Sequence, residues 1–118
     1  IALGSHCAGL MSEDEDLATR LQDAGRATFD RVWRLPLWSE YSEEMKGSTT
    51  DLKNLGGRYG GAITAGAFLK EFTDGASYAH LDIAGVSWDD AHRPYNRGKG
   101  ATGFGVRLLV RFLQDLAK

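Results

Sequence analysis

Three glycines near the carboxyl end of the sequence have the spacing of a phosphate-binding loop. Gly98, Gly100 and Gly103 form a G-x-G-x-x-G pattern, which in dinucleotide-binding proteins follows a strand, opens a helix and precedes an acidic residue about 20 positions on. Here a charged segment containing Pro94 comes first, and only 15 residues follow Gly103. We therefore interpret the glycines as a tight turn into a final helix, where Lys99 could still meet an anion at the helix N-terminus.

His80 and Asp82 are the candidate metal ligands. They are two positions apart on an expected strand, so their side chains share a face and could bind a metal ion together. Two ligands are too few for a closed site, and His6 and His92 have no supporting spacing. We therefore expect His80 and Asp82 to be satisfied polar groups at the end of a buried strand.

Cys7 and Arg58 are further side chains capable of chemistry. Cys7 is the single cysteine; it would need a histidine beside it in space to act as a nucleophile, and otherwise is a small buried or half-buried thiol. Arg58 lies between glycine pairs in "LGGRYGG", where it could bind a carboxylate or phosphate, or hold the loop through backbone carbonyls. We expect Trp33, Trp38 and Trp88 to anchor the core or a subunit interface.

The apolar periodicity predicts the elements that must position these residues. The apolar residues 1–4 are typical of a strand, and Ser12 and Glu15 have the spacing of a capping box for a helix that reaches Val32. The further expected elements are an extended piece before Pro36, a polar surface segment at 41–54, a helix at 62–73, a strand at 78–86, a loop at 87–100 and a helix from 106. This alternation predicts an α/β layered structure.

Two of these elements have a predicted inner face. In strand 78–86, the alternation places Ala79, Leu81 and Ile83 on one face and Tyr78, His80 and Asp82 on the other. In the last helix, the helical spacing predicts a buried stripe with the arginines outside. The stripe consists of Val106, Leu109, Val110, Leu113 and Leu116, and the outer residues include Arg107 and Arg111.

Composition and charge limit the class of protein. The 118 residues suffice for one domain, and the net charge of -2 argues against a nucleic-acid partner. No run of about 18 apolar residues occurs, so we expect no membrane span, and no secretory signal is visible. A single cysteine excludes an internal disulfide and favours a reducing compartment, so we expect a cytoplasmic protein.

Four segments together resemble the C-terminal end of the leucyl aminopeptidase family of metallopeptidases. They are "WRLPL", "DLKNLGGRYGGAITAGAFLKEF", "YAHLDIAGVSW" and "KGATGFGVRLLVRFL". The resemblance implies that residues 1–118 are a C-terminal fragment of the catalytic domain, an α/β piece with a partial mixed sheet flanked by helices. It also implies an intact cytoplasmic homo-hexamer in which two divalent ions (manganese, zinc or magnesium) activate water to remove N-terminal residues from peptides.

The family's metal-binding signature, N-T-D-A-E-G-R-L, does not occur in this sequence, and neither does its upstream lysine-bearing segment. The resemblance therefore implies that this fragment carries no metal ligand and no catalytic residue, and that it is inactive alone. It implies a part of the pocket for the substrate's first side chain, formed by Leu55, Ala84 and Ser87. Ala84 would leave room for a bulky group, and Leu55 would supply apolar surface.

Two other functions stay open. The fragment could be a non-catalytic oligomerisation or partner-binding module, because surfaces that serve the family's hexamer would remain on it. It could also bind a metal ion or a carboxylate independently, through His80, Asp82 or Arg58.

Overall fold

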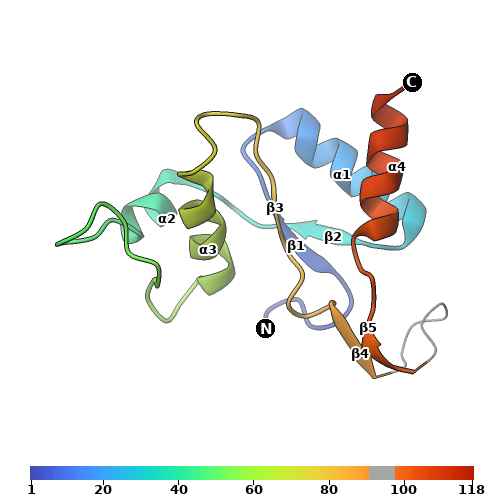
Figure 1. Cartoon of the computed structure of the whole chain (residues 1–118), viewed down its shortest axis with the longest axis horizontal. Helices are drawn as coiled ribbons and strands as arrows, with labels where there is room; N and C mark the ends of the chain where they lie inside the picture. The colour runs from blue at the N-terminus through green and yellow to red at the C-terminus, as the bar shows by residue number, and fades with distance from the viewer. Residues whose placement is uncertain (91–97) are drawn as a thin grey trace.

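The computed structural model describes residues 1–90 and 98–118, so His92 lies outside the described residues. The elements are β1 (Ala8–Met11), α1 (Glu15–Thr28), β2 (Val32–Arg34), α2 (Ser39–Glu44), α3 (Gly61–Lys70), β3 (His80–Asp82), β4 (Trp88–Asp90), β5 (Lys99–Ala101) and α4 (Val106–Leu116). The predicted α/β class, with a mixed sheet flanked by helices, is confirmed (Figure 1). None of the described helices has the length and apolar character needed to cross a membrane.

Strand β1 is the centre of a three-stranded sheet in the order β2-β1-β3. It pairs in parallel with β2 and antiparallel with β3, and all four of its residues are buried. Strands β4 and β5 form a separate antiparallel pair, so the prediction of a loop over residues 87–100 is wrong where these two strands lie. Trp88 of β4 pairs with Ala101 of β5.

Consecutive residues of β1 point to opposite faces of the sheet, and each face is covered by helices. Leu10 packs against α1 and α4, in a cluster with Ala18, Leu21, Ala24 and Leu108. Met11 packs on the other face against Leu37 and against Ala67 of α3. Helices α1 and α4 therefore form one layer and α3 another, with the sheet between them (Figure 1).

The N-terminus of α1 is capped by Asp14, and the predicted capping role of Ser12 is wrong. The Asp14 side chain accepts a hydrogen bond from the Leu17 N–H at 2.9 Å, as an N-cap should. The Ser12 hydroxyl instead donates to the Tyr78 carbonyl at 2.7 Å and accepts from the Asp14 N–H at 3.1 Å. Ser12 thus ties the start of α1 to the segment that leads into β3.

One expected strand and two expected element boundaries are also wrong. Helix α1 ends at Thr28, because Phe29 has a left-handed φ of 63°, so Val32 belongs to β2. The expected strand at 1–4 does not form, and Gly4 has φ 63° within a turn. Strand β3 is shorter than 78–86, because the Ile83 carbonyl accepts hydrogen bonds from two amides further along and closes a turn.

The predicted buried stripe of α4 is wrong. Leu108 is the buried residue of this helix, and Phe112 packs beside it against α1. The five stripe residues are 46% to 63% exposed: Val106, Leu109, Val110, Leu113 and Leu116. Arg107, expected outside, donates to the buried carboxylate of Asp30 at 2.8 Å. The contact with α1 therefore buries a different face of α4 from the one that the apolar spacing predicts.

Candidate functional site

Ala84 lies in a well-defined turn at the carboxyl end of β3. Its N–H donates to a carboxylate oxygen of Asp82 at 3.1 Å. The Ile83 carbonyl accepts from the Val86 and Ser87 amides at 3.0 and 2.9 Å. The turn therefore presents the exposed Ala84 at a fixed place beside the sheet end.

A small cavity of about 80 Å³ lies next to this turn and has Ala84 in its wall. Its lining is mostly apolar or backbone: residues 1–4, Cys7, Gly9, Leu35, Ala62, Asp82, Ala84 and Gly85. An engineered protein cavity that accepts benzene has a volume of about 150 Å³. The cavity bounded by the residues of this chain is therefore about half as large.

Gly85 allows the first residues of the chain to form one wall of the cavity. A Cβ atom at this position would lie 2.4 Å from the backbone oxygen of Gly4, a separation that no real side chain tolerates. The first residues of the chain therefore pass directly against the turn that carries Ala84. Glycine at position 85 permits this close approach of two backbone segments.

The three sequence-predicted pocket residues do not meet at this cavity. Ala84 lines it, whereas Leu55 and Ser87 do not. Leu55 is 79% exposed on the loop before α3. Ser87 is half-buried, and its carbonyl accepts from the N–H of Thr102, which follows β5, at 2.9 Å. The assignment of all three residues to a substrate pocket stays a prediction.

His80 and Asp82 share the face of β3 that α3 covers, as the alternation predicts. Gly66 of α3 packs closely against the His80 ring, since a Cβ there would lie 3.4 Å from it. Burial lowers the pKa of His80, and the nearby Asp82 carboxylate opposes this effect. Within residues 1–90 and 98–118, no group of three or more histidine, cysteine or acidic side chains could hold a metal ion. This donor set does not fit a two-metal centre.

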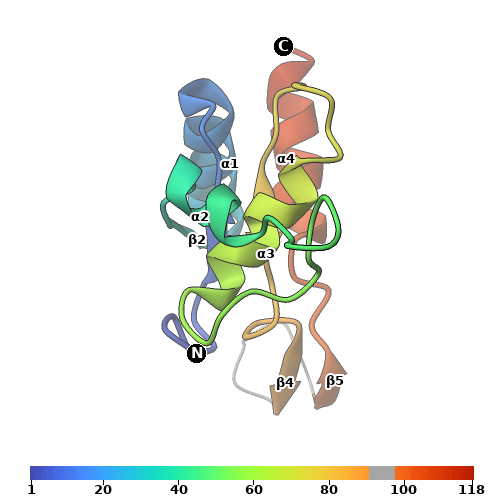
Figure 2. The same ribbon diagram turned by 90° about the vertical axis from the view of Figure 1, so that its left-hand side faces the viewer.

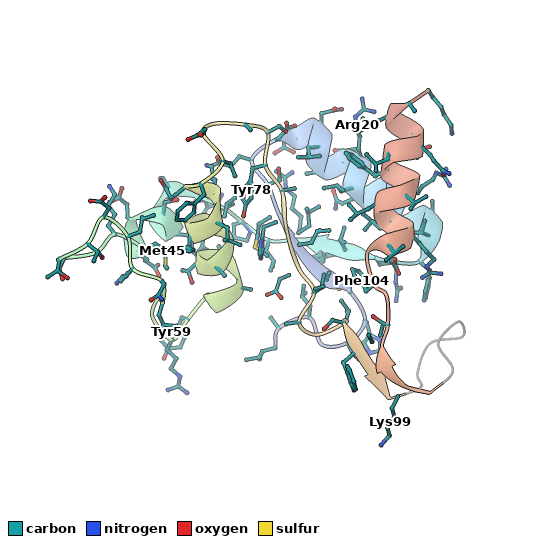
Figure 3. The ribbon with its side chains drawn as sticks, viewed as in Figure 1. Arg20, Met45, Tyr59, Tyr78, Lys99 and Phe104 are labelled. Carbon is teal, nitrogen blue, oxygen red and sulfur yellow. The ribbon has the colours of Figure 1, made fainter. Side chains whose placement is uncertain are left out.

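The N-terminus of α4 meets an anion of the chain itself, the Asp30 carboxylate. Gly105 is the N-cap, with φ 94°, and its N–H donates to the Asp30 carboxylate at 3.1 Å. Lys99 belongs to β5 and points away from the body of the molecule (Figure 3). The turn interpretation is confirmed at Gly103, which has φ 67° just before α4, whereas Gly100 belongs to strand β5 although its φ of 150° is also positive. Sequence patterns missed Asp30, because its partners are more than 70 residues away.

Cys7, Arg58 and the three tryptophans are the remaining candidates from the sequence. Cys7 is half-buried and lines the cavity. Arg58 is exposed, and its guanidinium lies 5.9 Å from the ring centre of Tyr59. The tryptophans are not core residues, because Trp33, Trp38 and Trp88 are each about 64% exposed. Their possible role at a subunit interface stays a prediction.

Comparison with known proteins defines the family. Residues 1–110 match the model of the catalytic domain of the cytosol aminopeptidase family. Probable cytosol aminopeptidases from Geotalea uraniireducens and Mannheimia succiniciproducens are 53% and 52% identical over 98% and 100% of this chain. A solved structure of a tomato leucine aminopeptidase mutant matches 97% of the chain with a TM-score of 0.86 and 38% identity.

The chain therefore belongs to the cytosol aminopeptidase family, a family of metallopeptidases, and matches its catalytic domain. It spans about 23% of the length of these curated relatives and 22% of the tomato chain. The resemblance inferred from the four segments is confirmed.

Proposed function

We propose that residues 1–118 are the C-terminal part of the catalytic domain of a metal-dependent leucyl aminopeptidase. The intact enzyme removes N-terminal residues from peptides and works as a cytoplasmic homo-hexamer. The observation that carries this proposal is the match of almost the whole backbone to tomato leucine aminopeptidase, at a TM-score of 0.86 with 38% identity.

The part played by this chain is to scaffold the site and to bind a side chain. The hydrogen-bonded turn after β3 holds Ala84 beside the apolar cavity of about 80 Å³, where the substrate's first side chain would bury apolar surface. Such burial contributes about 25 cal/mol per Å², and one methylene group changes selectivity by about 1–3 kcal/mol. Leu55 and Ser87 are proposed as more distant parts of this wall.

The two divalent ions implied by the family would supply an activated water and polarise the scissile carbonyl. The described residues of this chain do not form a group that fits them. We therefore assign their ligands to the rest of the intact enzyme and expect zinc, manganese or magnesium there. The residues of this chain orient the peptide and exclude water from its first side chain.

A chimeric enzyme tests the proposal. Residues 1–118 replace the matching stretch in the full-length Geotalea uraniireducens relative, which is 53% identical to them. Hydrolysis of leucyl-anilide is then measured with Mn²⁺ or Zn²⁺ for the chimera, for the unaltered relative and for the isolated chain. We expect turnover by the chimera and the relative and none by the isolated chain. A folded but inactive chimera beside an active relative, or turnover by the isolated chain, would refute the proposal.

A further inference from the structure

The side chain of Asp82 forms the hydrogen bond that begins the turn after β3. One carboxylate oxygen accepts from the N–H of Ala84, two residues further along, at 3.1 Å. Aspartate side chains commonly bond to a backbone N–H two positions on, in the arrangement called an Asx turn. The backbone of Asp82 is held by its pairing with Gly9 of β1, so this bond attaches Ala84 directly to the sheet.

Two backbone hydrogen bonds close the same turn, but they act on residues beyond Ala84. Both are accepted by the Ile83 carbonyl, from the amides of Val86 and Ser87. A substitution at position 82 leaves these two bonds in place, because they contain no side-chain atom. Val86 is fully buried and anchors the far end of the turn. The place of Ala84 therefore depends on Asp82, whereas the closure of the turn does not.

Asp82 also forms part of the wall of the cavity beside Ala84. The cavity lies between this turn, residues 1–4 and Ala62 of α3, and Figure 2 shows the start of the chain below α3, close to the turn before β4. A Cβ atom at Gly9 would lie 3.7 Å from the Asp82 Cβ, so the aspartate side chain packs against β1. A half-buried carboxylate in a mostly apolar wall is unfavourable unless it is hydrogen-bonded, and the Ala84 N–H provides such a bond.

We propose that Asp82 is a positioning residue for the substrate pocket. Its hydrogen bond to the Ala84 N–H fixes Ala84 at the wall where the first side chain of the peptide binds; this inference rests on the proposed function. A leucyl side chain extends further toward this wall than an alanyl side chain, so a wall held in one place favours leucyl peptides. Asp82 thereby contributes to selectivity without touching the scissile bond.

A carboxylate beside the pocket could instead act through its charge, by attracting the free amino group of the peptide. One pair of substitutions separates the two roles. Asp82→Asn removes the charge and keeps a side-chain oxygen that accepts from the Ala84 N–H, whereas Asp82→Ala removes both. The assays are run at about pH 8, where His80 is neutral because burial lowers its pKa below its ordinary 6.5. Loss of the neighbouring Asp82 charge therefore leaves the protonation of His80 unchanged.

Hydrolysis of leucyl-anilide and alanyl-anilide by the chimera tests the positioning role. We expect Asp82→Ala to raise KM for leucyl-anilide about 5-fold, the equivalent of one lost hydrogen bond, and KM for alanyl-anilide less than about 2-fold. The kcat values should stay within about 2-fold, because the wall contacts the ground state and the transition state alike. Asp82→Asn should restore the wild-type values, and Asp23→Ala, on the exposed side of α1, should have no effect. An Asp82→Asn variant as impaired as Asp82→Ala, or equal effects on the two substrates, would overturn the proposal.

Amide hydrogen exchange in the chimera follows the turn itself and requires no activity. The Ala84 amide should exchange at least about 10-fold faster in Asp82→Ala than in the wild type or Asp82→Asn, because its acceptor is lost. The Val86 and Ser87 amides, which bond to the Ile83 carbonyl, should be unchanged and so show that the variant is folded. An unaffected Ala84 amide, or loss of protection at all three amides, would contradict the positioning role.

Calorimetric binding of L-leucine and L-alanine to the chimera separates this inference from the proposed function. If an inactive chimera binds L-leucine about 5-fold more weakly after Asp82→Ala, with L-alanine binding unchanged, the role of Asp82 stands and only the hydrolytic activity is refuted. An active chimera whose Asp82→Ala variant keeps the wild-type preference for leucyl substrates would refute only the role of Asp82. A chimera that neither binds L-leucine nor hydrolyses leucyl-anilide would refute both.

Discussion

Among the charged side chains of residues 1–90 and 98–118, Asp30 should be the one whose replacement is most damaging. The Asp30 carboxylate is 1% exposed and joins the end of α1 to the start of α4. One oxygen accepts from the Gly105 N–H at 3.1 Å, and the other accepts from the Arg107 guanidinium at 2.8 Å. It thus stabilises the N-terminus of α4, where a negative charge is favourable.

The expected cost of Asp30→Ala follows from these contacts. A buried N–H that loses its acceptor costs about 1–3 kcal/mol. Arg107 is 42% exposed, so water replaces part of its lost ion pair, and we assign about 1 kcal/mol to that contact. We therefore expect Asp30→Ala to lower the free energy of unfolding by about 3 kcal/mol.

Urea denaturation of the isolated chain, followed by circular dichroism, measures this cost. Asp23→Ala is the matched control, because its carboxylate pairs with Arg26 on the exposed side of α1, and such pairs contribute about 0.3–0.5 kcal/mol. If the free energy of unfolding of Asp30→Ala stays within about 1 kcal/mol of the wild-type value, the Asp30 hydrogen bonds do not stabilise the contact between α1 and α4 as described.

Three further predictions concern packing, pH and selectivity. Gly25→Ala should lower the free energy of unfolding by about 2 kcal/mol, because the new Cβ would lie 2.7 Å from the Asp30 carbonyl oxygen, and this clash outweighs the better helix propensity of alanine. Urea denaturation should show no such loss for Gly57→Ala, because a Cβ at position 57 would have open space around it. Burial lowers the pKa of His80 below its ordinary 6.5, so the unfolded chain binds the proton more readily and stability should fall as pH drops below about 6.5. His80→Gln should flatten this dependence in denaturation curves between about pH 7 and 5, and an unchanged slope would refute it. In the chimera, Ala84→Leu should raise KM for leucyl-anilide more than for alanyl-anilide, and equal effects would exclude Ala84 from the pocket.

The local patterns could predict the alternation of β3 but not the orientation of α4. Ala79 and Leu81 pack on one face and Tyr78 on the other, as a period of two requires. Helix α4 has apolar residues on more than one side, so the spacing alone offers two candidate inner faces. The contact with α1, where Leu108 packs against Gly25, determines which face of α4 is buried.

The missed features depend on contacts between distant parts of the sequence. Ser12 and Asp14 are both good capping residues, and the choice between them depends on the Tyr78 carbonyl, which is 66 residues away from Ser12. Asp30 meets Arg107 across 77 positions, and no periodicity encodes that meeting. The family resemblance suggested Ala84 as a pocket residue, but only the folded chain shows the cavity beside it.

Metal content gives the most direct test of the claim that this chain is a scaffold whose working ions are held elsewhere. The isolated chain and the chimera are dialysed against Mn²⁺ or Zn²⁺, and the bound ions per chain are counted. The account predicts two ions on the chimera and well under one on the isolated chain. Two ions bound tightly by the isolated chain would contradict it.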